Sequence, residues 1–101
     1  MVARERGAEP GAGYNVDRLR LMVEKFVSGE IETGTFCAWF EEAFNFDMDR
    51  SALSRRERKA FTGLFDEVVY YSPFADERAV FPNYRDEAQI LAAAEACLQR
   101  L

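Results

Sequence analysis

Apolar residues recur along the chain with the spacing of amphipathic helices, most clearly between residues 54 and 71. There they fall at i, i+3, i+4 and i+7, at Phe61, Leu64, Phe65 and Val68. This spacing places them on one face of a 3.6-residue period. Ser54 is a suitable N-cap, and Glu57 three residues later completes a capping box. The pattern therefore predicts a helix over residues 54–71.

Three further segments repeat this period, at residues 15–28, 33–46 and 86–101. Their apolar stripes are Val16, Leu19, Val23 and Phe26 in the first, Phe36, Trp39, Phe40, Ala43 and Phe44 in the second, and Ile90, Leu91, Ala94, Cys97, Leu98 and Leu101 in the last. Asn15 or Asp17 is suited to cap the first helix, and Gly29 to take the left-handed position after its end. Asp86 and Gln89 form a second capping box. We therefore predict four helices in all.

These helices indicate an all-α fold, an antiparallel up-down four-helix bundle, because most connections are short. No hairpin signal appears, and the β-branched runs are too short for a sheet. Pro73 ends the third helix, since the residue before a proline avoids the helical region. Residues 72–85 then form the only long loop, and we expect its aromatic residues Phe74, Phe81 and Tyr84 to pack down on the core.

A length of 101 residues with 49% hydrophobic residues indicates one domain, which we place at residues 14–101. Residues 1–13 are rich in Gly and Pro and show no periodicity, so we expect a flexible tail or a start-codon or cloning artefact. The chain has no signal-peptide core and no apolar run long enough to span a membrane. A cytoplasmic location is therefore expected.

The chemistry of the side chains argues against an enzyme. Histidine, the commonest general base and metal ligand, is absent. The chain has no nucleophile motif and no phosphate-binding glycine loop, and the adjacent carboxylates Asp66 and Glu67 do not face each other on a helix. Cys37 and Cys97, on different helices, are expected to be reduced core residues and make a poor zinc site. We expect neither a catalytic activity nor a cofactor.

Charge is distributed unevenly between the two ends of such a bundle, although the net formal charge is only −5. One end would hold far more acids than bases: Glu24, Glu30, Glu32, Asp66, Glu67, Asp76, Glu77, Asp86 and Glu87 against Lys25, Arg78 and Arg85. We call it the acidic end. At the opposite end, we expect the acids that close the second helix to pair with the bases that open the third.

The acidic end also holds Tyr70, Tyr71 and Phe74. Acids around aromatic residues suit a strongly basic protein surface, because the acids steer the encounter and the aromatic residues anchor it. The net negative charge argues against general nucleic-acid binding. The alternative is a solvated acidic face whose carboxylates cap the N-termini of the second and fourth helices.

The order of several short motifs resembles the colicin D immunity protein family of small bacterial immunity proteins. The motifs are Ser28-Gly29-Glu30-Ile31 followed by Phe36, then Leu64-Phe65-Asp66-Glu67-Val68 leading to Tyr71, then Arg78, Tyr84 and Asp86. The likeness covers about residues 16–101, and its order and spacing carry more weight than any single motif.

The resemblance implies a four-helix bundle that binds and blocks a cognate nuclease toxin, in the type member a tRNA-cleaving one. Acidic residues of the immunity protein there occupy the basic tRNA-binding cleft of the toxin. Asp66 and Glu67 match the family's acidic pair, and Asp86 matches its acidic start to the last helix. Gly34-Thr35 and Arg85 stand where relatives more often carry an acid and an aliphatic residue, which leaves open a different toxin.

We therefore predict a bacteriocin or contact-dependent growth inhibition immunity protein, monomeric or weakly dimeric, that makes no direct contact with nucleic acid or membrane. Its predicted toxin-binding residues are Asp66, Glu67, Tyr70, Tyr71, Phe74, Asp76, Glu77, Asp86, Glu87, Glu30 and Glu32. The alternative function is a small helical regulatory or adaptor protein that binds DNA through the start of the third helix. Its candidate residues are Arg55, Arg56, Arg58 and Lys59, which we call the basic turn.

Overall fold

The computed structural model describes residues 15–101, and most of them are helical. The α-helices are α1 (Val16–Val27), α2 (Thr33–Glu42), α3 (Arg55–Val68), α4 (Ala75–Val80) and α5 (Glu87–Arg100). A π-helical turn, η1 (Ala43–Asp47), and a 3-10 turn, η2 (Arg50–Ala52), connect α2 to α3. The described residues form no strand beyond an isolated bridge, which confirms the all-α class. The predicted tail at residues 1–13 lies outside the described part of the chain.

The helices begin where side chains satisfy their free N–H groups. Asn15 accepts a hydrogen bond from the backbone N–H of Arg18 at the start of α1. Both capping boxes form as predicted: Ser54 with Glu57 begins α3, and Asp86 with Gln89 begins α5. Gly29 follows α1 with a φ of 89°, in the left-handed region that a residue with a Cβ avoids.

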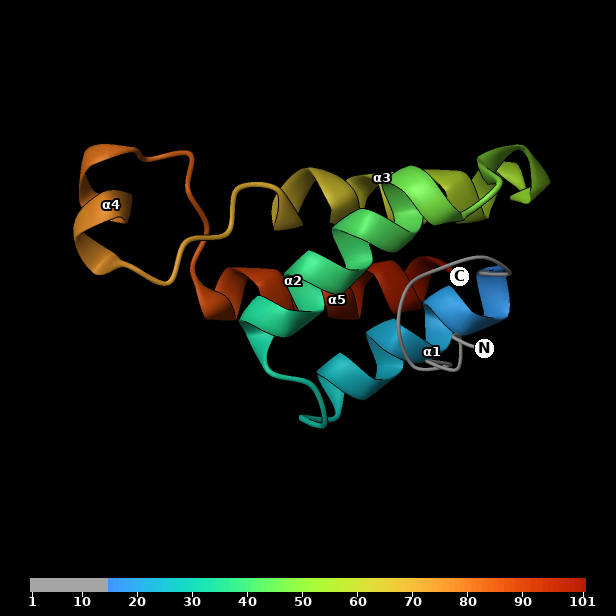
Figure 1. Cartoon of the computed structure of the whole chain (residues 1–101), viewed down its shortest axis with the longest axis horizontal. Helices are drawn as coiled ribbons and strands as arrows, with labels where there is room; N and C mark the ends of the chain where they lie inside the picture. Colours follow the sequence, from blue (N-terminus) through green and yellow to red (C-terminus); the bar gives the residue numbers. More distant parts are fainter. Residues whose placement is uncertain (1–14) are drawn as a thin grey trace, which may run out of the picture.

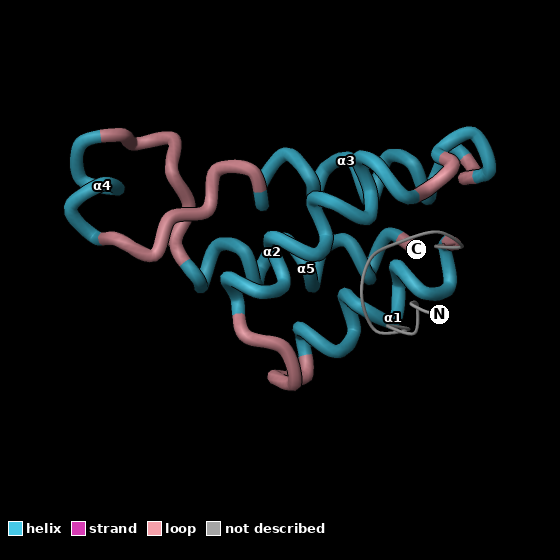
Figure 2. The backbone as a smooth tube through the Cα atoms, viewed as in Figure 1, coloured by secondary structure: helices cyan, strands magenta, loops and turns pink. Residues whose placement is uncertain are grey.

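The four longer helices contact one another in a closed order, since α1 packs on α2 and α5, and α3 packs on α2 and α5. Figure 1 shows α3 and α5 side by side in opposite directions, with α1 and α2 oblique to them. This arrangement does not by itself confirm the regular up-down bundle that the sequence suggested. The short helix α4 stands away from the others, between two stretches of loop (Figure 2).

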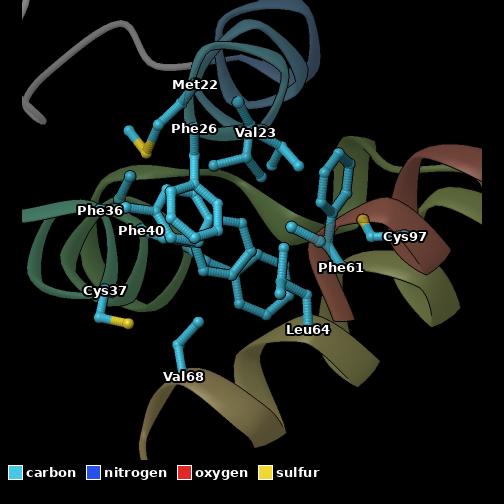
Figure 3. Packing of buried hydrophobic residues seen from close by; sticks show 14 of the residues in the cluster. Met22, Val23, Phe26, Phe36, Cys37, Phe40, Phe61, Leu64, Val68 and Cys97 are labelled. Atoms are coloured by element: carbon cyan, nitrogen blue, oxygen red, sulfur yellow. The ribbon is translucent and has the colours of Figure 1, made fainter. Parts of the chain in front are cut away.

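A chain of phenylalanine rings fills the space between α1, α2 and α3 (Figure 3). The rings of Phe26 and Phe36 stack with centroids 4.2 Å apart, and Phe40 lies 6.2 Å from Phe61. Most residues of the predicted stripes are therefore in the core, and others, such as Trp39 and Leu91, are partly buried against it. Cys37 and Cys97 are free thiols buried on different helices, which confirms that prediction.

Residues 72–85 differ from the sequence prediction in two ways. They contain the helix α4, which the sequence analysis assigned to loop. Phe74 and Phe81 are exposed, so the expectation that they pack on the core is wrong. The physical reason is that α4 is only six residues long and too short to bury an apolar stripe of its own. Acidic residues in its first turn favour the helix through the macrodipole.

Candidate protein-binding surface

The end of α3, α4 and the starts of α2 and α5 lie at the same end of the molecule (Figure 1). The hydroxyl of Thr33, in the first turn of α2, donates to Glu87 Oε2 in the first turn of α5 at 2.9 Å. An isolated backbone bridge joins Tyr71, after α3, to Arg85, before α5. The end of α3, α4 and the starts of α2 and α5, which carry most of the acids of the predicted acidic end, therefore lie in one region of the fold.

Residues 72–85, which we call the α4 loop, are closed at their base. The N–H of Ser72 donates to the carbonyl of Arg85 at 3.0 Å, and the N–H of Arg85 donates to the carbonyl of Tyr70 at 2.8 Å. The guanidinium of Arg85 also donates to Glu67 Oε1 at 2.6 Å and to the carbonyl of Asn83 at 2.8 Å. Such closure of both ends is typical of compact Ω-type loops.

Ser72 holds the start of the α4 loop from within. Its side chain is buried, and its hydroxyl donates to Glu77 Oε1 at 2.6 Å and accepts the N–H of Phe74 at 3.2 Å. The guanidinium of Arg78 donates to the carbonyl of Ser72 at 2.7 Å. The position of α4 is therefore fixed by side chains as well as by the backbone bridge.

Several predicted binding acids have structural roles within the chain. Glu32 caps α2 by accepting the N–H of Thr35, and Asp86 caps α5. Glu30 accepts the hydroxyl of Ser28 at 2.8 Å, and the carboxylates of Glu67, Glu77 and Glu87 accept the bonds described above. The capping role that the sequence left open as an alternative is thus real for Glu32 and Asp86.

Two of the predicted acids are freer. Asp66 is exposed and has no hydrogen bond or ion pair within the described part of the chain. Asp76 is also exposed and accepts only the N–H of its neighbour Glu77. These two carboxylates, on the last turns of α3 and the first turn of α4, are the best placed to meet a partner.

The aromatic residues of the acidic end divide in the same way. Tyr70 and Phe74 are exposed, whereas Tyr71 is half-buried. Burial, and then the nearby carboxylate of Glu87, raise the pKa of the Tyr71 hydroxyl above its usual value. The tyrosine therefore stays neutral, and its backbone forms the bridge to Arg85 at the base of the α4 loop.

The sequence analysis did not select two exposed apolar residues of the α4 loop, Val80 and Phe81, as binding residues. They belong to no apolar stripe that packs against another helix. The sequence carries no local signal for their exposure, because a helix of six residues gives no full apolar stripe.

At the opposite end, the expected charge pairing does not form. Within the described residues, no ion pair joins the basic turn to Glu41, Glu42, Asp47 or Asp49. The turns η1 and η2 separate the end of α2 from the start of α3, and Asp49 instead accepts both the N–H and the hydroxyl of Ser51. The four basic side chains of the basic turn are exposed.

A shallow groove of about 550 Å³ follows the contact between α3 and α5. Small residues such as Gly63, Ala92 and Ala96 line it, with Glu67 and Arg85 at the acidic end. No cluster of three or more potential metal ligands occurs in residues 15–101. In the same residues, no helix has both the length and the apolar character needed to cross a bilayer.

Comparison of the chain with protein-family models, with curated proteins and with solved structures found no match.

Proposed function

We propose that this chain is a non-catalytic immunity protein that binds the nuclease domain of a bacterial toxin and blocks its basic substrate cleft. The observation that carries the proposal is the coincidence of free carboxylates and exposed apolar side chains at one end. Asp66 and Asp76 supply the free charge, and Tyr70 and Phe74 the exposed aromatic area. In this proposal the four longer helices act as an antiparallel bundle that holds the acidic end rigid.

The proposed mechanism is substitution of carboxylates for phosphates. A nuclease that cleaves tRNA binds the backbone of its substrate through Lys and Arg side chains, which also form strong hydrogen bonds with carboxylates. The net charge of −5 accelerates the encounter with such a domain, and the exposed aromatic residues slow its dissociation. The complex would form in the cytoplasm, from a monomer or weak dimer, without a cofactor.

Growth rescue tests the proposal directly. The chain is co-expressed with the C-terminal domain encoded by the adjacent gene, and colony growth is scored. We expect that domain to be toxic alone and harmless with the parent chain. If the domain is toxic and the parent chain gives no rescue, the proposed function is wrong.

A charge-matched pair of variants assigns the interface. The first variant converts Asp66, Glu67, Asp76 and Glu77 to Asn or Gln, which retain hydrogen-bond acceptors for Ser72 and Arg85. The second makes the same Asn or Gln replacements at four acids on other parts of the molecule, Asp17, Glu41, Glu42 and Glu95. We expect loss of rescue for the first variant and parental rescue for the second. The reverse result would place the interface elsewhere.

A regulatory or adaptor protein that binds DNA is the second candidate. It is favoured by one observation, the exposed basic turn without ion-pair partners on α2. Phosphate contacts from four cations would give binding that weakens steeply with salt. A mobility-shift experiment with non-specific duplex DNA at low salt separates the candidates, because the immunity protein should leave the duplex unshifted.

A further inference from the structure

We infer that the α4 loop is a pre-organised apolar anchor, which inserts Phe74, Val80 and Phe81 into an apolar depression beside the basic cleft of the partner. The inference rests on the proposed function and specifies how the same end of the molecule binds. It assigns most of the binding energy to three side chains, only one of which the sequence analysis had selected.

The first observation is the exposure of these side chains. Phe74 is 58% exposed, Val80 68% and Phe81 53%, all within one short segment that projects from the helices (Figure 1). Tyr70 and Val69, where α3 ends, are exposed as well. Apolar side chains gathered in this way on a protein surface are typical of interaction sites.

The second observation is that the loop presenting them is held in place. Arg85 joins its two ends through Glu67 and the backbone of Tyr70, and Ser72 fixes the start of α4 through Glu77. A segment that is ordered before binding avoids the entropy cost that a flexible loop meets on association. The network therefore suits a rigid anchor better than a mobile tether.

Charge around the anchor selects the occupant. Asp76 is exposed in the first turn of α4 and Asp66 in the last turns of α3, while the cations of the loop, Arg78 and Arg85, both donate hydrogen bonds to their own chain. A second copy docked face to face would bring two acidic surfaces together, because a two-fold interface uses the same surface of both copies, and like charges so close repel each other. A basic protein surface with an apolar depression is the complementary partner.

A triple variant, Phe74→Ser, Val80→Ser and Phe81→Ser, tests the anchor. Its matched control is Leu21→Ser with Phe46→Ser, two side chains that are 49% and 76% exposed on α1 and η1, away from α4. The Kd of each variant is measured against a catalytically inactive form of the adjacent-gene domain. Circular dichroism establishes that both variants keep the helical content of the parent.

We expect the triple variant to bind about 30-fold more weakly or worse, mainly through faster dissociation, as for truncation of interface hot spots. The control should bind within about threefold of the parent, since exposed side chains outside an interface contribute little. Triple-variant binding at parental strength would overturn the anchor. If the triple variant bound normally but the variant at Asp66, Glu67, Asp76 and Glu77 lost binding, the proposed function would stand without the apolar anchor.

Other outcomes also decide the question. Weaker binding by the Leu21 and Phe46 control alone would move the interface off the α4 loop and overturn the inference. Sedimentation that shows a parental dimer, lost only in the triple variant while toxin binding is kept, would make a second copy the occupant. If the parent neither binds the domain nor protects against it, the proposed function fails and the anchor with it.

Discussion

Phe40 lies at the centre of the aromatic chain that joins the first three long helices. Its ring neighbours Phe36, Phe44 and Phe61, and its side chain is completely buried. We expect Phe40→Ala to lower the free energy of unfolding by about 3–5 kcal/mol, through lost burial and the cavity left behind. Urea denaturation measures this change. The control is Trp39→Ala on the same helix, where the side chain is only half-buried and the loss should be smaller.

The two buried thiols make stability depend on pH. Burial raises the pKa of Cys37 from 9.0 to about 12 and that of Cys97 to about 11. Above pH 9 the unfolded chain releases these protons while the folded chain keeps them. Their stabilisation is therefore fully present below pH 9 and is lost as the pH rises toward 11 and 12.

Urea midpoints at pH 9 and near pH 11 test this dependence in the parent and in Cys37→Ala with Cys97→Ala. The parent should lose more stability over this range than the double variant, because only the parent carries the thiols. Equal losses would show that other groups control the alkaline transition. Native thiols should also resist iodoacetamide, which reacts with the thiolate.

At the scale of the element, Arg85 joins the two ends of the α4 loop. Arg85→Met removes the ion pair with Glu67 and the bond to Asn83, yet keeps an apolar stem. Global stability should fall by less than about 1 kcal/mol, because the pair is partly exposed to solvent. Amide hydrogen exchange should accelerate in residues 72–85 and stay unchanged in α1 and α2.

Arg85→Met also separates the contribution of loop order to binding from the contribution of the negative charge. Removing the cation makes the acidic end more negative, so binding by charge alone would become tighter. A pre-organised anchor instead predicts weaker binding, since the loop must be ordered on association. Tighter binding by Arg85→Met, with faster exchange in the loop, would contradict the proposal that an ordered α4 loop strengthens binding.

The elements with long apolar stripes could be predicted from the sequence, and their caps could be too. Ser54 and Asp86 each have a partner three residues later, so the signal is local. The helix α4 could not be found in this way, because six residues give no full stripe and its apolar side chains face outward. The turns η1 and η2 have no strong local signal either.

The candidate site could likewise be predicted only in part from the sequence. Which helix ends share the acidic end follows from helix order, and Figure 1 shows the end of α3, α4 and the starts of α2 and α5 at one end of the molecule. Which carboxylates are free does not follow, since Glu67 is engaged by Arg85 from across the loop and Glu87 by Thr33 from another helix. Such pairs depend on tertiary geometry that no local pattern contains.

For the whole molecule, the central claim is that an acidic end binds a basic domain. The most direct test is the Kd for the inactive adjacent-gene domain, measured for the parent and both four-acid variants between about 50 and 200 mM salt. We predict that parental affinity falls as salt rises, and that the variant at Asp66, Glu67, Asp76 and Glu77 binds weakly with little salt dependence. Parental affinity and salt dependence in that variant would contradict the claim.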